Sequence, residues 1–380
     1  MLEIAIVGGG LCGLALANSL RAHGLACEVF EARPRLGGRI HSVAARNNGL
    51  ALDLGAAWFW PRHQPRIVRL LGELGLASFP QHENGTMLAL KDAESPPVRI
   101  ELDDLHGGAY RIEGGTAALI HALAARLPAE CLHPEHVLEH LEAASDHVVL
   151  RLRHGHEARE LRARQVVLAL PPRLVEERIG FTPLLNGQLR ELLREQPTWM
   201  AGQAKAVAAY GRGDGMDAEG LDRAAFWRDE GQSGNAFARY PRAVLAEVHD
   251  ACDALGSRAA LSAFLALEAQ ARGAFRLGLP LLVGSQLAQL FGARAQEAEI
   301  HIQDWADEPW TCARLDLTPT VEHPAYAARA LQAPTWGGRL HFGGSETAAQ
   351  GGGYMEGALE AAGRLCREVL ATRASGVGVA

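Results

Sequence analysis

The sequence has little of what marks metal-binding, secreted or membrane-spanning proteins. Its six cysteines include no CxxC pair, which argues against the usual zinc-ligand spacing and against a disulfide framework. No apolar run reaches the roughly 18 residues of a membrane span, and no basic segment precedes an apolar one near Met1. We therefore expect reduced thiols, no metal, no membrane segment and no signal peptide, with the cytoplasm as the location.

Positive charge is sparse, and lysine is sparser still. Lysine and arginine together number 37 against 44 acids, and no basic run is long enough to follow a phosphate backbone. The chain also lacks HExxH, GxSxG and P-loop patterns, so a metallohydrolase, a serine hydrolase or an NTPase has no support. With 48% hydrophobic residues over 380 positions, the composition indicates a globular protein of two structural units that does not bind nucleic acid.

The start of the chain has the pattern of a dinucleotide-binding βαβ unit. A β-branched run ends at Gly8, and Gly10 and Gly13 complete a GxGxxG turn before apolar positions at helical spacing. Such a turn lets the backbone approach a pyrophosphate at the N-terminus of the helix. Glu31 closes the next strand, where a carboxylate accepts bonds from a ribose hydroxyl. These residues predict a bound dinucleotide, and they leave NAD and FAD equally open.

Later segments indicate that this fold returns after an excursion. A helix follows Gly114-Gly115, a buried strand at 166–170 stops at Pro171, and a last strand at 340–343 precedes an apolar-faced helix. The stretch 188–304 differs in content, with tryptophans, alanine-rich helices and Gly/Asp-rich loops. We therefore predict an α/β fold with a doubly wound Rossmann-like domain of residues 1–78, 108–187 and 305–380, interleaved with a smaller α+β substrate domain of residues 79–107 and 188–304.

A cluster of arginines and glycines directly follows Glu31. Arg33, Arg35 and Arg39 surround Gly37-Gly38. Such a segment can wrap the far side of a pyrophosphate, but surface charge clusters are more often simply solvated. The residues of this cluster alone leave both interpretations open.

Six blocks of the sequence, taken together, resemble the flavin-containing amine oxidase family, the monoamine and polyamine oxidases with their short bacterial relatives. The blocks are IVGGG at 6–10, EARPRLGGR at 31–39, LDLGA at 52–56 with Pro61 and Arg66, EGG at 113–115, VVLALPP at 166–172, and FGGSETA at 342–348 leading to GYMEGA at 353–358. Their order is specific and they span nearly the whole chain. The stretch 210–300 matches the family poorly.

The resemblance implies FAD as the dinucleotide. The implied cofactor residues are Glu31 on the adenosine ribose, Gly10 and Gly13 at the pyrophosphate with Gly8, Arg33 and Gly38 beside them, Arg39 near the phosphates, Val137 beside the adenine, Glu346 near the ribityl chain, and the backbone of Met355 near the flavin pyrimidine. The positive end of the helix at Met355 would stabilise the negative charge of a reduced flavin. The cysteine that tethers flavin in some members falls at Arg314, and in an extended segment Cys312 would lie about 7 Å away, so we expect non-covalent FAD.

The resemblance also points to catalytic and substrate-pocket residues. Lys205 aligns with the lysine that holds a water at flavin N5, although a lysine on a strand can instead reach solvent with its head group. Tyr354 matches one of the two aromatic side chains along the amine path, and the second position falls at Leu315. The tryptophans that could line a reshaped pocket, or equally lie in the core, are Trp58, Trp60, Trp305 and Trp310.

The implied activity is that of an FAD-dependent oxidoreductase, an amine or amino-acid oxidase. It would transfer hydride from a C–H bond next to nitrogen to flavin N5, with reoxidation by oxygen. Two alternatives stay open. One is a flavin desaturase or dehydrogenase acting on C–C bonds, and the other is a flavin-binding protein with little catalysis, which Leu315 and the poorly matching middle favour. The expected partner is a small molecule, with an amine as the implied class, and neither nucleic acid nor a membrane.

Overall fold

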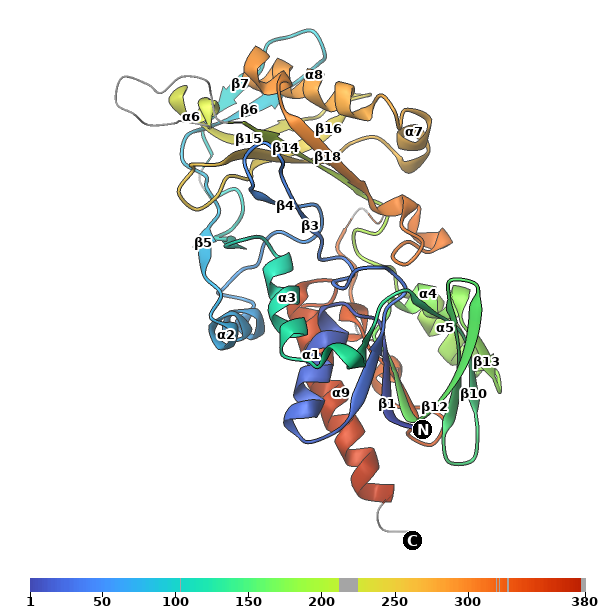
Figure 1. Cartoon of the computed structure of the whole chain (residues 1–380). Coiled ribbons are helices and arrows are strands. Elements are labelled where there is room, and N and C mark those ends of the chain that lie inside the picture. Colours follow the sequence, from blue (N-terminus) through green and yellow to red (C-terminus); the bar gives the residue numbers. More distant parts are fainter. Residues whose placement is uncertain (103, 212–224, 319, 321, 327, 377–380) are drawn as a thin grey trace.

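The computed structural model describes residues 1–102, 104–211, 225–318, 320, 322–326 and 328–376. Within them the chain forms an eight-stranded and a seven-stranded sheet that lie in separate halves of the molecule (Figure 1). The half with the eight-stranded sheet holds both chain termini, and the chain crosses between the halves repeatedly (Figure 1). No helix of the described residues is long and apolar enough to span a membrane.

The predicted βαβ unit is confirmed. It consists of β1 (Leu2–Val7), α1 (Leu11–Ala22) and β2 (Cys27–Phe30), and the two strands pair in parallel. Gly8 adopts a φ of +110°, a conformation that L side chains rarely reach, and this allows the sharp turn into α1. The turn therefore brings the N-terminus of α1 to the carboxyl end of β1, where a Rossmann-like fold binds its ligand.

The eight-stranded sheet has a parallel centre and an antiparallel flank. β12 (Glu157–Leu168) pairs in parallel with β1 and β19 (Leu340–Phe342), and antiparallel with β11 (Val148–His154). The remaining strands are β9 (Leu132–His133), β10 (His136–Ala143) and β13 (Gly180–Thr182).

Helices cover one face of this sheet and mixed elements cover the other. Apolar residues of α1, α2 (Pro65–Leu74), α3 (Ala117–Ala125) and α9 (Met355–Gly376) form one core on the first face. Residues of β10, β11, α4 (Pro172–Arg178) and α5 (Gly187–Glu195) form a second core on the other. The expected α/β fold is present, and the antiparallel flank takes the place of crossover helices on the second face.

The seven-stranded sheet is assembled from segments far apart in the chain. Its strands, in spatial order, are β18 (Glu299–Asp304), β14 (Ala204–Tyr210), β17 (Ala259–Leu265), β16 (Leu245–Asp250), β15 (Gln232–Ala238), β6 (Thr86–Leu90) and β7 (Val98–Ile100). The segment 79–107 supplies β7, which is one edge of this sheet, and its neighbour β6. All of these strands lie within 79–107 and 188–304, which supports the domain division that we propose for the chain.

Strand β14 has two faces with different partners. Ala204, Ala206 and Ala208 belong to the core beneath α8 (Leu279–Phe291), whereas Val207 and Ala209 pack with Leu50, Leu52 and Leu54 around β4 (Ala51–Asp53). Because side chains alternate along a strand, Lys205 lies on the second face, toward the eight-stranded half. The other described strands and α-helices are β3 (Ser42–Ala44), β5 (Ser78–Pro80), β8 (Tyr110–Ile112), α6 (Phe226–Asp229) and α7 (Ala269–Ala274).

Candidate active site

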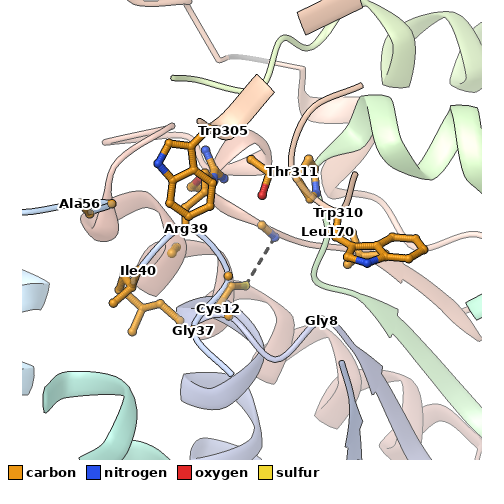
Figure 2. Close-up of a pocket in the computed structure, with 18 of the residues that line it drawn as sticks. Gly8, Cys12, Gly37, Arg39, Ile40, Ala56, Leu170, Trp305, Trp310 and Thr311 are labelled. Atoms are coloured by element: carbon orange, nitrogen blue, oxygen red, sulfur yellow. Dashed lines mark hydrogen bonds between the residues drawn. The ribbon is translucent and has the colours of Figure 1, made fainter. Parts of the chain in front are cut away.

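A cavity of about 420 Å³ lies between the two halves. Figure 2 shows Gly8, Cys12 and Gly37 on one side of it, and Trp305, Thr311 and Trp310 on the other. Nearly all of the residues predicted for the site line this cavity: Gly8, Gly10, Glu31, Arg33, Gly38, Arg39, Val137, Lys205, Glu346, Tyr354, Met355, Trp60, Trp305 and Trp310. Gly13 and Leu315 are the two that do not.

Two glycine-rich loops meet at one end of the cavity, which we call the glycine end. Gly37 N donates to Gly9 O at 2.8 Å. A Cβ added at Gly10 would meet Gly37 O at 3.8 Å and Gly38 Cα at 4.0 Å, which are ordinary contacts, and Gly10 itself borders the cavity. No described side chain caps the N-terminus of α1 at this point, which leaves its amide donors available. Exposed backbone and unpaired donors fit a pyrophosphate group.

Gly13 is the last glycine of the GxGxxG turn. A Cβ at this position would lie 2.0 Å from Gly8 O, so only glycine lets α1 pack against the end of β1. Gly13 does not itself line the cavity, and the space beside it is taken up by the packing of α1 against the end of β1.

Glu31 is buried at the glycine end with its carboxylate held by backbone amides. Gly9 N donates to Oε2 at 2.9 Å, and Arg33 N donates to Oε1 at 3.0 Å. The Arg33 guanidinium turns to the C-terminal part of the chain, donating to Glu308 Oε2 and to Thr311 Oγ1 at 2.6 Å. A carboxylate fixed in this way faces the cavity in one orientation, as a ribose-binding acid requires.

Arg39 joins the N-terminal and C-terminal blocks across the cavity. Its guanidinium lies 2.6 Å from Glu346 Oε1 and donates to Ser345 Oγ at 3.0 Å and to Trp199 O at 3.2 Å. The arginine cluster after Glu31 is therefore not a solvated surface loop: Arg33 and Arg39 both line the cavity. The positive charges of Arg33 and Arg39 are paired with Glu308 and Glu346, and these ion pairs hold the loop in place.

Lys205 is not a surface lysine. It is 2% exposed, and its ammonium donates to Gly55 O at 3.1 Å and lies 5.1 Å and 5.8 Å from the ring centres of Trp58 and Phe264. Burial lowers the pKa of Lys205 to about 8, while the negative charge of Asp53 opposes that shift. The lysine thus sits in a dry site where it can gain or lose a proton near neutral pH.

Aromatic side chains surround Lys205, and we call this part of the cavity the aromatic end. Trp58, Phe264, Trp60 and Tyr354 line it. The Tyr354 ring meets Trp60 edge-on at 5.9 Å and stacks on His323 at 4.7 Å. Phe264 lies opposite Lys205 across the β14–β17 pairing, in the stretch that matches the family poorly, so no sequence pattern pointed to it.

The prediction that Leu315 lines the substrate pocket does not agree with the structure. It is 46% exposed on the one-turn helix Arg314–Asp316, whose inward-facing member is Asp316. Arg173 donates to Asp316 Oδ1 at 2.5 Å and so fixes this turn with Leu315 facing outward. The position that the resemblance implied for the second aromatic side chain consequently falls outside the cavity.

The thiols of the chain are buried and uncharged. Burial raises the pKa of Cys312 to about 12, and this residue does not line the cavity. Cys12 does line it, where its Sγ accepts from Gly344 N at 3.4 Å (Figure 2) and burial raises its pKa to about 11. Within the described residues, no group of three or more His, Cys, Asp or Glu is placed to hold a metal ion.

Comparisons with known proteins agree with this geometry. A family model described as flavin containing amine oxidoreductase matches residues 89–370, and one for an NAD(P)-binding Rossmann-like domain matches residues 6–74. Amine oxidase [flavin-containing] A of Equus caballus is 22% identical over 97% of this chain and 85% of its own length. For amine oxidase [flavin-containing] B of Sus scrofa the values are 24%, 97% and 86%.

Solved structures show the same fold. Wild-type putrescine oxidase bound to putrescine superposes with a TM-score of 0.75 at 21% identity, covering 97% of this chain and 99% of that one. Cyclohexylamine oxidase from Brevibacterium oxydans IH-35A gives 0.73 at 18% identity, with 98% and 99% covered. These structures confirm the expected fold. The family model, which matches more than half of the chain, confirms the FAD cofactor and the enzyme class, and the chain belongs to the flavin-containing amine oxidoreductase family as an FAD-dependent oxidoreductase.

Proposed function

We propose that this enzyme oxidises an amine with one nitrogen and an apolar body, using non-covalently bound FAD and oxygen as the electron acceptor. The observation that carries this proposal is the buried Lys205 at the aromatic end of a cavity whose glycine end is suited to a dinucleotide. Similar proteins of known structure include a putrescine oxidase and a cyclohexylamine oxidase, which supports an amine as the substrate class.

The lining residues divide the cavity between cofactor and substrate. Glu31 and Val137 would hold the adenosine, Gly10 and Arg39 the phosphates, and Met355 at the start of α9 the flavin. When bound, FAD supplies a two-electron acceptor for the C–H bond next to nitrogen, and oxygen takes the electrons as hydrogen peroxide. The residues at the aromatic end orient that C–H bond and exclude bulk water.

Lys205 and the N-terminus of α9 provide the positive charge of the site. The first-turn amides of α9 at Met355 carry partial positive charge, which stabilises negative charge on a group placed against them. Lys205 donates one bond to Gly55 O, so its other N–H groups can donate to a water at the cavity wall. Both features act on charge that develops during the reaction.

The aromatic end selects against a second cationic group on the substrate. The carboxylates that line the cavity, Glu31 and Glu346, are already bound by backbone amides or by Arg39. Lys205 is the charged side chain among the described residues at the aromatic end, and it repels an ammonium ion. A diamine would leave its distal ammonium unpaired there, at a cost that an apolar amine does not incur.

Steady-state kinetics with cyclohexylamine, benzylamine and putrescine test this proposal. We expect kcat/KM for the apolar amines to exceed that for putrescine by roughly tenfold or more, about 1.4 kcal/mol. Gln203 lines the cavity two residues before Lys205, and Gln203→Glu adds a carboxylate there with almost no change in shape. The variant should move the preference toward putrescine. A wild-type preference for putrescine would overturn the proposed substrate class.

Other functions give different results in the same experiments. A desaturase acting on C–C bonds would leave its flavin oxidised with every amine and would use a dye or quinone in place of oxygen. A flavin-binding protein with little catalysis would be reduced by dithionite and by no amine.

The six free, buried thiols support a reducing compartment, for which we propose the cytoplasm.

A further inference from the structure

A second, much smaller cavity of about 10 Å³ shares part of its wall with the large one. Lys205, Trp58 and Ala57 line both, so the lysine borders the active site on one side and this small cavity on another. Its remaining lining comes from β4, β8, β14, β16 and β17, with Asp53, Arg111, Asp250 and Ser262 as the polar members. A volume of this size corresponds to one water molecule, and a polar lining is what retains water in a protein interior.

Two buried polar atoms of the lining have no partner among the described residues. They are Asp53 Oδ2 and Ser262 Oγ, on side chains that are 5% and 4% exposed as residues. The other carboxylate oxygen of Asp53 is fully used, since it accepts from Ser42 Oγ, Thr116 N and Thr116 Oγ1. An unpaired buried carboxylate oxygen is costly, so the lining requires a donor at this point.

The charges around the small cavity favour a neutral occupant over a metal cation. Lys205 and Arg111 bring two positive charges, against the carboxylates of Asp53 and Asp250. The Asp250 carboxylate already forms an ion pair with Arg228 at 2.9 Å. The Arg111 guanidinium donates to the backbone carbonyls of Cys252 and Ala251. Lys205 and Asp53 therefore remain the charged pair with unused bonding capacity, and no ion pair within the described residues joins them directly.

We propose that the small cavity binds one water molecule, which bridges Lys205 Nζ, Ser262 Oγ and Asp53 Oδ2, and that Asp53 acts through this water to keep Lys205 protonated. Asp53 is thus a positioning residue for the active site, and the idea rests on the proposed role of Lys205. Of the other titratable groups around the lysine, the cation Arg111 on β8 opposes its protonation. His249 on β16 meets Trp58 edge-on, and burial lowers the pKa of this histidine, which favours its neutral form.

This arrangement makes a definite prediction about pH. Burial drives Lys205 toward the neutral form, and the Asp53 charge works against it. Removing that charge in Asp53→Asn should move the protonation of Lys205 to lower pH by about one unit, a tenfold change in proton affinity. Ser262→Ala removes one of the water's partners and keeps the charge, so it should shift protonation in the same direction by less.

The experiment compares four variants of the FAD-loaded enzyme. Stopped-flow reduction and reoxidation are measured from pH 6 to 10, together with the absorption spectrum of the bound flavin across the same pH range, FAD content and melting temperature. Comparison with Lys205→Met identifies the part of the rate–pH profile that depends on titration of the lysine. Ser42→Ala is the matched control, because it removes one bond to Asp53 Oδ1 and leaves both the charge and the small cavity intact.

We expect Asp53→Asn to shift the lysine-dependent part of the pH profile, and the matching spectral change, to lower pH by about one unit. Ser262→Ala should shift it less, and Ser42→Ala should leave it in place. Equal shifts in Asp53→Asn and Ser42→Ala, or no shift in either Asp53→Asn or Ser262→Ala, would overturn the proposal. If Asp53→Asn does not fold, Ser262→Ala decides by itself. If Lys205→Met lacks any effect on the pH profile, the proposed function of Lys205 fails instead. A crystal structure showing no ordered water between Asp53 and Ser262 would also refute the bridge.

Discussion

Replacing Lys205 by methionine deletes one charge at the cavity wall and keeps an unbranched apolar side chain of similar length. The lost group is a positioned positive charge in a dry site, and removing such a group costs about 2.7–4 kcal/mol, or ~10²–10³ in rate. This is the upper range to expect here, because the N-terminus of α9 remains in place. Flavin reduction by an amine and reoxidation by air should be followed separately by stopped-flow absorbance.

The same variant should fold as well as the parent. The pKa of Lys205 is about 8 in the folded protein, below its ordinary value of 10.5, so the unfolded chain binds more protons between these pH values and stability rises with pH in that window. At pH 7 the cost of burying the charge is present in full, roughly 3 kcal/mol. Lys205→Met removes this cost and loses one hydrogen bond of about 1 kcal/mol together with the ring contacts. Its melting temperature at pH 7 should therefore not fall.

The chain offers a matched control, since Lys91 is its other lysine and is exposed. Lys91→Met should change neither rate. If both rates in Lys205→Met stay within about threefold of the parent, less than ~1 kcal/mol, then the lysine does not act on the flavin and the aromatic end is not where the reaction occurs.

Three further outcomes can be checked on purified protein. Glu31→Ala should weaken FAD binding by roughly one to two decades, through loss of a charge-assisted bond, and an unchanged Kd from flavin titration would remove Glu31 from the site. Gly10→Ala should fold but lose FAD, whereas Gly13→Ala should lower the free energy of unfolding by about 1–3 kcal/mol, because its methyl group would meet Gly8 O; flavin content and melting separate the two. Acid precipitation should release the flavin, and a pellet that stays yellow would implicate a thiol such as Cys12.

Local patterns predicted the nucleotide-binding part of the fold well, because the determining residues are neighbours in the chain. The glycine turn at Gly8, the strand that ends before Glu31 and the long last helix all depend on spacing within one segment. The sequence left open whether Lys205 is buried or reaches solvent, and the structure shows it buried. What such patterns cannot give is which strands pair, since pairing joins segments that are distant in the sequence.

The parts that escaped prediction are those set by non-local pairing. Phe264 reaches the cavity because β17 pairs with β14 in a register that places it opposite Lys205. Leu315 was misplaced because counting along the chain ignores the turn that Asp316 fixes by burying its own carboxylate. The small cavity behind Lys205 combines five strands, and no single segment contains a signal for it.

The decisive measurement is an anaerobic titration of the bound flavin with cyclohexylamine. We expect one equivalent of amine to bleach one equivalent of flavin, and admission of air to restore the absorbance with one equivalent each of hydrogen peroxide, ammonia and ketone. Lys91→Met should behave like the parent. A flavin that dithionite reduces, but that stays oxidised with cyclohexylamine, benzylamine and putrescine alike, would contradict the claim that this cavity oxidises amines.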